Sequence, residues 1–197
     1  MRRFQGLLAS GIAVLTLLIS GCGINNIPTY DEAATAAWSQ VLNQYQRRAD
    51  LVPNLVETVK GFAKQEQDVL MGVVEARSKV GSMQIPKDIL TNPQAFQQFQ
   101  KNQDQLGSAL SRLLVVVERY PDLKSNQNFL TLQSQLEGTE NRIAVARKDY
   151  IEAVQRYNTE IRTFPGRLWK GILYSEMEPK QNFSAPDSVQ DVPKVKF

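Results

Sequence analysis

Apolar residues recur every seven positions along most of the chain after residue 30, and this repeat constrains the fold more than any other feature. Two rows with this spacing form the seam along which helices pack. No stretch shows the sustained alternation of apolar and polar residues that is typical of a half-buried strand. The sequence therefore predicts an all-α protein. In the first long segment the two rows are Trp38, Tyr45, Val52, Val59 and Val73, and Leu42, Ala49, Val56, Ala63 and Leu70.

The seven-residue register of this first segment continues across a proline. We interpret Asp31 to Ser78 as one long helix that bends at Pro53, because proline removes a backbone donor and collides with the preceding helical turn. A break of the helix at Pro53 is the alternative interpretation.

Two further helices are expected. Asn92-Pro93 combines a favoured N-cap residue with the proline that suits the first helical position, so a second helix begins there and ends before Tyr120-Pro121. Ser125 is expected to cap a third helix, which ends at Phe164-Pro165-Gly166. The expected core rows are Phe96, Leu110 and Val117; Phe99, Leu106, Leu113 and Tyr120; and Phe129, Leu136, Ile143, Tyr150, Tyr157 and Phe164.

Long helices that are joined by short connections pack antiparallel to one another. We therefore expect residues 31–174 to form an elongated antiparallel bundle of three long helices, with a short C-terminal helix at Arg167 to Tyr174. Residues 175–197 are rich in proline and polar residues and have little periodicity, so they are expected to form an extended or mobile tail.

The N-terminus has the layout of a bacterial secretory signal. Residues 1–21 contain two arginines, then an apolar run, then small residues. Ile19-Ser20-Gly21-Cys22 matches a lipobox, in which the cysteine is acylated and becomes the new N-terminus. We therefore expect a lipid anchor on Cys22, a tether over residues 22–30, and a protein on the periplasmic side of the outer or inner membrane. An uncleaved helix in the inner membrane is the alternative.

Composition excludes many kinds of chemistry. The chain has no histidine and one cysteine, which rules out disulfide frameworks, cysteine-rich zinc sites, histidine-held haem and imidazole catalysis. Glu137 and Glu140 share a helix face, but no third ligand, phosphate loop or nucleophile motif accompanies them. Without residues 1–21, 21 basic residues stand against 20 acidic ones, and no basic cluster indicates nucleic-acid binding. We expect no enzymatic activity, cofactor or metal.

Residues 46–56, QRRADLVPNLV, are similar to the signature of the LemA family, and the remaining motifs follow in the family's order. The resemblance covers Tyr30 to Phe197, and its other motifs are Ala37-Trp38, Glu75-Ala76-Arg77, Tyr120-Pro121-Asp122-Leu123-Lys124, Leu136-Glu137, Glu140-Asn141-Arg142-Ile143-Ala144-Val145-Ala146-Arg147, Tyr157-Asn158, Phe164-Pro165-Gly166 and Val195-Lys196-Phe197.

This resemblance implies a bacterial membrane-attached protein with an antiparallel helical bundle, in a family whose molecular function is not established. Related proteins are often encoded near membrane proteins with TPM domains or near membrane metalloproteases, which suggests a partner or adaptor role. Many relatives carry an N-terminal transmembrane segment in place of a lipobox. Compartment and orientation therefore rest on Cys22 here.

The polar residues of the signature are candidates for interaction. In one interpretation they form an ionic layer that sets the register of the bundle by meeting Glu137, Glu140 or Arg142. In another, the proline frees a backbone carbonyl near Ala49, which forms a recognition site with the neighbouring polar side chains. The candidate residues are Arg47, Arg48, Asp50, Pro53 and Asn54.

The segment RLWKGILY, residues 167–174, also has two interpretations. In the one that we favour, Leu168, Ile172 and Leu173 close the end of the bundle. In the other, Trp169 and the basic residues beside it contact a lipid interface or a partner. The leading functional hypothesis is a non-catalytic scaffold or adaptor for membrane proteins of the cell envelope. The alternatives are a lipid-interacting protein that senses or remodels the bilayer and a self-assembling spacer.

Overall fold

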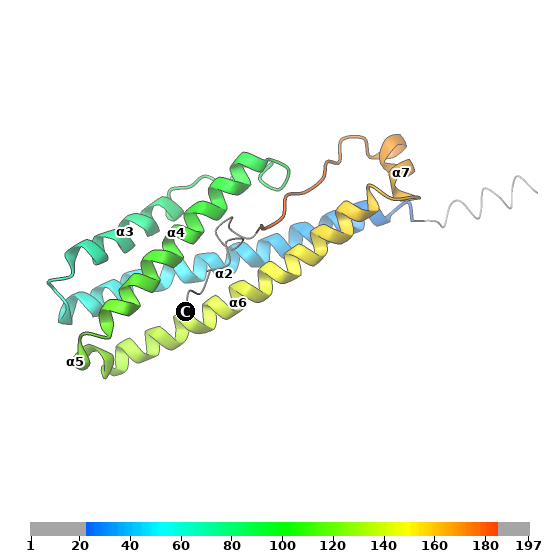
Figure 1. The fold of residues 1–197 in the computed structure, drawn as a ribbon. Helices are drawn as coiled ribbons and strands as arrows, with labels where there is room; N and C mark the ends of the chain where they lie inside the picture. Colours follow the sequence, from blue (N-terminus) through cyan, green and yellow to red (C-terminus); the bar gives the residue numbers. More distant parts are fainter. Residues whose placement is uncertain (1–22, 185–197) are drawn as a thin grey trace, which may run out of the picture. The chain divides into compact units, whose positions relative to one another are not determined.

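The computed structural model describes residues 23–184, and these residues are all-helical apart from their connections (Figure 1). The prediction of an all-α fold is confirmed. The expected signal peptide, the acylated Cys22 and the end of the tail lie outside the described residues. The helices are α2 (Asn26–Phe62), α3 (Gln67–Gly81), α4 (Pro93–Val117), α5 (Pro121–Lys124), α6 (Gln127–Glu160) and α7 (Gly166–Leu173).

The expected single helix from residue 31 to residue 78 is wrong, because the chain turns between α2 and α3 over residues 63–66. Ala63 stays on its predicted core row and is buried within the turn, so the heptad register hides the break. Glu66 holds the turn in place through distant partners. Its carboxylate accepts a hydrogen bond from Tyr120 Oη at 3.0 Å and pairs with Arg119 Nη2 at 3.0 Å.

Helix α2 passes through Pro53 without ending, as expected. It begins at Asn26, so residues 26–30, expected to be part of a tether, are helical. Ile27 explains this extension, because its side chain is fully buried and packs with Tyr157 and Ile161. Burial of a large aliphatic side chain typically stabilises the folded state by about 1.5–3 kcal/mol, which favours an additional helical turn at this point.

The N-cap of α4 is the residue that the sequence predicts, and the N-cap of α6 is the residue after the predicted one. Asn92 Oδ1 accepts a hydrogen bond from the Ala95 amide at 3.1 Å, which confirms Asn92 as the N-cap of α4. Helix α6 is capped by Asn126 instead of Ser125, because Asn126 Oδ1 accepts from the amides of Asn128 and Phe129. The hydroxyl of Ser125 donates to the carbonyl of Asp122.

The described chain divides into two compact units. The larger unit comprises residues 37–151 and 181–184, and the smaller unit comprises residues 23–36 and 152–180. In the larger unit the chain reverses direction at each connection between α2, α3, α4 and α6 (Figure 1). This unit therefore contains four antiparallel helical segments, where we expected three, because α3 is a separate helix.

An aromatic cluster forms one part of the core of the larger unit. The ring centroid of Trp38 lies 5.1 Å from that of Phe99 and 5.3 Å from that of Tyr150. Phe183 joins the cluster from the C-terminal segment, with its centroid 5.1 Å from that of Phe96. Gln181 fixes that segment, because its amide donates to Leu90 O and its carbonyl accepts from Tyr150 Oη. Residues 181–184 thus contribute to the core.

The smaller unit is built around Tyr157 and Asn158, which hold the segment after α7 against α6. Tyr157 Oη donates to Glu178 O at 3.0 Å. The amide side chain of Asn158 donates to Lys180 O and accepts from Lys180 N, both at 2.9 Å. Lys180 Nζ also pairs with Asp31 at 2.9 Å, so the segment is joined to α2 as well.

We predict that alkaline pH destabilises the protein partly through Tyr157. Burial, together with the nearby Asp31 carboxylate, raises the pKa of this phenol from its ordinary 10.0 to about 12. Between these two values the unfolded state loses a proton that the folded state retains, so the free energy of unfolding falls as the pH rises. The decrease is about 1.4 kcal/mol per pH unit for this tyrosine.

Urea denaturation between pH 8 and pH 11.5 measures this dependence. The Tyr157→Phe variant is expected to be less stable than wild type at pH 8, because it lacks the hydrogen bond to Glu178. Its free energy of unfolding is expected to fall less steeply above about pH 10. Parallel curves for the two proteins would contradict the raised pKa.

Candidate functional site

Arg48 occupies the centre of a polar layer in the larger unit. Its side chain is buried between α2, α4 and α6, with only 4% of the residue exposed. Nη1 pairs with Glu140 Oε1 at 3.1 Å, and Nη2 donates to the Gln103 carbonyl at 2.9 Å and to Gln103 Oε1 at 2.7 Å. The predicted ionic layer is therefore formed in part, by Arg48 with Glu140 as its acidic partner. Glu137 accepts from Gln133 instead.

An aromatic ring lies beside the Arg48 guanidinium. The Arg48 guanidinium carbon lies 5.0 Å from the ring centroid of Tyr45. Burial raises the pKa of the Tyr45 phenol, and Arg147 and Arg48 partly oppose that shift. Arg48 Nε has no hydrogen-bond partner among the described residues. Such a layer fixes how α2, α4 and α6 align, because any other register leaves the buried charge without acceptors.

The carbonyl that Pro53 leaves without a helical donor is that of Ala49, and a neighbouring helix supplies the missing donor. Arg77 Nε on α3 donates to Ala49 O at 3.1 Å. Arg77 belongs to the Glu75-Ala76-Arg77 motif, so two separate motifs of the sequence meet here. The Ala49 carbonyl, which we considered as part of a recognition site, thus accepts a hydrogen bond that joins α3 to α2.

The other signature residues point to the surface of the larger unit. Arg47, Asp50, Pro53 and Asn54 are exposed. Asp50 Oδ1 accepts from Gln46 Nε2 at 2.7 Å within the same helix. The structure therefore brings Arg48 together with Glu140 but leaves these four residues on the outside of α2. An interaction role for them stays a prediction.

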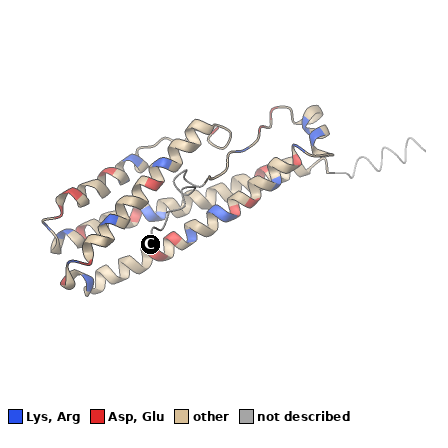
Figure 2. Cartoon of the chain, viewed as in Figure 1, with Lys and Arg blue, Asp and Glu red and all other residues tan. Residues whose placement is uncertain are grey.

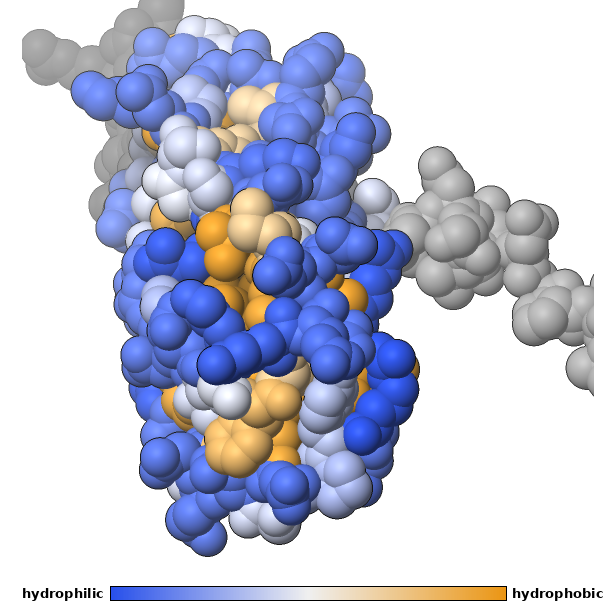
Figure 3. All heavy atoms as spheres, turned by 90° about the vertical axis from the view of Figure 1, so that its left-hand side faces the viewer, coloured by the Kyte–Doolittle hydropathy of each residue, from blue (hydrophilic) through white to orange (hydrophobic). Residues whose placement is uncertain are grey.

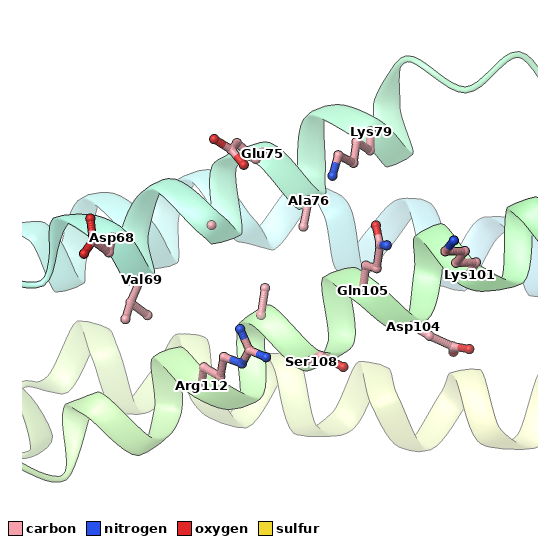
Figure 4. Close-up of a pocket in the computed structure, with 12 residues that line it drawn as sticks. Asp68, Val69, Glu75, Ala76, Lys79, Lys101, Asp104, Gln105, Ser108 and Arg112 are labelled. Carbon is pink, nitrogen blue, oxygen red and sulfur yellow. The ribbon is translucent and has the colours of Figure 1, made fainter. Parts of the chain in front are cut away.

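A groove between α3 and α4 is a candidate binding site that the sequence did not indicate. Its volume is about 650 Å³. Small residues on both helices line it, namely Gly72 and Ala76 on α3 and Ser108 and Ala109 on α4. Figure 4 shows Val69 of α3 and Gln105 and Arg112 of α4 reaching into the space between the two helices. Recognising this groove requires knowing that α3 folds back along α2.

Charges of both signs border the groove. None of its six charged side chains forms an ion pair within the described part of the chain. Figure 2 shows acidic and basic residues interspersed along α3 and α4. A polypeptide segment that carries both signs of charge is a suitable ligand for such a surface. The six are Asp68, Glu75, Asp104, Lys79, Lys101 and Arg112.

Exposed apolar side chains also occur in the larger unit. Phe62 at the end of α2 and Met71 and Val74 on α3 are exposed by 42%, 56% and 44%. Figure 3 views the side on which α2 ends and shows apolar atoms between hydrophilic side chains. Helix α3 therefore carries both exposed apolar side chains and one wall of the groove.

Trp169 belongs to the smaller unit, where it packs with Ile27, Tyr157 and Ile161. The expectation that Leu168, Ile172 and Leu173 close the bundle end is wrong, because these three side chains are 47%, 64% and 52% exposed. Phe164 was expected on a core row but is 85% exposed, since α6 ends at Glu160 before reaching it.

Two further properties bear on function. Nowhere between residues 23 and 184 do three or more cysteine, aspartate or glutamate side chains come close enough to share a metal ion. No helix in the same range combines the length and the apolar character needed to cross a bilayer.

The fold and the buried arginine layer define a class of all-α bundle protein whose sequence motifs serve mainly to join its helices. The model of the LemA family matches residues 37–197, and the chain belongs to the LemA family.

Several relatives are similar to this chain over part of their length. Magnetosome protein MamQ of Magnetospirillum gryphiswaldense is 26% identical over 170 residues, which cover 78% of this chain and 62% of the relative. Magnetosome protein MamQ 2 of Paramagnetospirillum magneticum is 42% identical over 59 residues, 30% of this chain and 22% of the relative. Protein LemA of Metamycoplasma hominis is 25% identical over 119 residues, 60% of this chain and 50% of the relative. The chain thus spans less than two thirds of each relative, and none of these names states an enzymatic activity.

Proposed function

We propose that this protein is a lipid-anchored, non-catalytic scaffold or adaptor that binds other membrane proteins of the cell envelope. The observation that carries the proposal is the α3–α4 groove, whose bordering charges have no ion-pair partners within the described residues. Charged side chains that are not paired within their own protein are available to pair with a second one. The groove is open along α3 and α4, so it suits an elongated polypeptide segment better than a small substrate.

Attachment to the membrane is proposed through acyl chains on Cys22. Two or more chains give stable attachment, whereas a single chain binds only marginally. The proposed location is the periplasmic side of the outer or inner membrane. The proposed partners are membrane proteins, and proteins with TPM domains or membrane metalloproteases are the classes that the family resemblance implies.

Site-specific photocrosslinking in cells tests the groove. A photoreactive residue in place of Gln105, which lies in the groove, is expected to give a reproducible adduct with one membrane protein. Gln135 on α6 is the matched control, because it is also exposed but lies outside the groove. The adduct is expected to weaken in an Arg112→Glu background, which reverses one groove charge. Identical adducts from positions 105 and 135, or none from either, would contradict the scaffold proposal.

Metabolic acyl labelling tests the anchor separately. Wild type is expected to incorporate label and to fractionate with membranes, whereas Cys22→Ser is expected to lose the label. An unlabelled wild-type protein would show that the anchor is wrong, even if the photocrosslink forms.

A further inference from the structure

Helix α7 exposes apolar side chains next to basic ones. Leu168 and Ile172 are one helical turn apart and share a face, and they are 47% and 64% exposed. Phe164, just before the helix, is 85% exposed, and Leu173 at its end is 52% exposed. Trp169 faces inward on Ile27 and Tyr157, so the helix is held to its unit by one side only. We call Phe164, Leu168, Ile172 and Leu173 the α7 patch.

Basic residues are the charged residues of the segment that carries the α7 patch. Residues 161–175 contain Arg162, Arg167 and Lys170 and no acidic residue, while Glu160 and Glu176 flank the segment. A short amphipathic helix with large apolar side chains and basic neighbours is typical of segments that lie in the interface of an anionic bilayer. A soluble partner protein with an acidic surface would also complement these basic residues. The position of the α7 patch relative to the N-terminus therefore decides between a bilayer and a soluble protein as its ligand.

The start of the described chain lies beside α7. A Cβ atom added to Gly23 would lie 3.7 Å from Glu160 Oε1, and one added to Gly166, the first residue of α7, would lie 2.9 Å from the same oxygen. Both glycines therefore lie near the Glu160 carboxylate, which places the start of α2 close to the start of α7. Cys22 immediately precedes Gly23, and the apolar run of residues 7–19 lies shortly before it. Either form of N-terminal anchor thus brings the bilayer close to α7.

We propose that the α7 patch inserts into the periplasmic leaflet of the same anionic bilayer that holds the N-terminus, with Arg167 and Lys170 at the level of the lipid phosphates. This gives the smaller unit a second contact with the membrane in addition to the anchor. The contact fixes the orientation of that unit on the lipid surface, because the unit then meets the bilayer at two places instead of one. The inference rests on the membrane attachment proposed above.

Fluorescence of the full chain in vesicles tests the insertion. The variant Ile172→Trp places a reporter on the α7 patch, and Val115→Trp is the matched control, because Val115 is a similarly exposed residue, 71% accessible, on α4. Both full-length acylated proteins are reconstituted in vesicles of phosphatidylcholine and phosphatidylglycerol that contain brominated acyl chains. Relative to wild type, Ile172→Trp is expected to show a blue-shifted signal that the brominated lipid quenches, and Val115→Trp is not.

Flotation of the same vesicles separates the two proposals. If the protein floats with the vesicles but Ile172→Trp is quenched no more than Val115→Trp, the insertion of α7 is wrong while the anchor stands. If the protein does not float, the membrane attachment is wrong and the α7 proposal falls with it. Replacing phosphatidylglycerol by phosphatidylcholine is expected to reduce the quenching, and equal quenching would overturn the role assigned to Arg167 and Lys170.

Discussion

The Trp38→Ala variant is expected to lose about 3–5 kcal/mol of its free energy of unfolding. Trp38 is only 5% exposed, and its ring contacts the rings of Phe96, Phe99, Tyr150 and Phe183. Alanine at this position removes a large buried surface and leaves a cavity that the four surrounding rings cannot fill together. The loss is also expected to release the C-terminal segment, since Phe183 is held there by these ring contacts and by the Arg147 guanidinium.

Urea denaturation followed by circular dichroism measures the stability loss. Val115→Ala is the control, because Val115 is exposed and its truncation is expected to change stability by less than about 0.5 kcal/mol. Proteolysis at the C-terminal segment reports its release, and faster cleavage is expected in Trp38→Ala under native conditions. A destabilisation below about 1 kcal/mol would show that the aromatic cluster is not packed as described.

The sequence predicted the core better than it predicted the connections. Most residues of the seven-residue rows from Trp38 to Tyr157 are buried, because burial of an apolar stripe is a local property of helix periodicity, and Leu42 and Tyr120 are half-buried. The turn between α2 and α3 was missed because Ala63 and Leu70 remain in register across it. The turn is held by contacts of Glu66 with Tyr120 and Arg119. These two residues are more than fifty positions away from Glu66 in the sequence.

The candidate site was only partly predictable for the same reason. An ionic layer involving Arg48 and Glu140 could be expected from two polar residues on core-facing helices, and it is present. The hydrogen-bond donor of the Ala49 carbonyl could not be predicted from the sequence. Arg77 reaches this carbonyl only because the chain reverses direction between α2 and α3. The α3–α4 groove depends on that same reversal. Contacts between helices that the periodicity identifies are readable from the sequence, whereas contacts that depend on the missed reversal between α2 and α3 are not.

These contacts also explain the motifs that define the resemblance. Arg48 with Glu140, Ala49 with Arg77, and Asn158 with Lys180 are each pairs from different segments of the chain. Their common effect is to join segments that are distant in the sequence, so these motif residues stabilise the fold. Partner choice is expected to reside in the α3–α4 groove.

The Arg48→Ala variant is expected to be destabilised by about 3 kcal/mol, at the lower end of the range for breaking a buried ion pair. The main cause is Gln103, whose buried Oε1 loses its donor when the guanidinium is removed. A buried acceptor without a partner costs about 1–3 kcal/mol, and the loss of the packed arginine stem adds to this. Glu140 contributes less, because its side chain is 43% exposed and water replaces the lost partner.

Two further variants separate these contributions by urea denaturation. Glu140→Gln keeps an acceptor for Arg48 and removes only the charge, so it is expected to cost less than about 1 kcal/mol and to lose its effect at high salt. Arg48→Met keeps most of the apolar stem, and its stability is expected to lie between those of Arg48→Ala and wild type. If Glu140→Gln were as destabilising as Arg48→Ala, the charge attraction to Glu140 would hold the layer together, and the hydrogen bonds to Gln103 would be secondary.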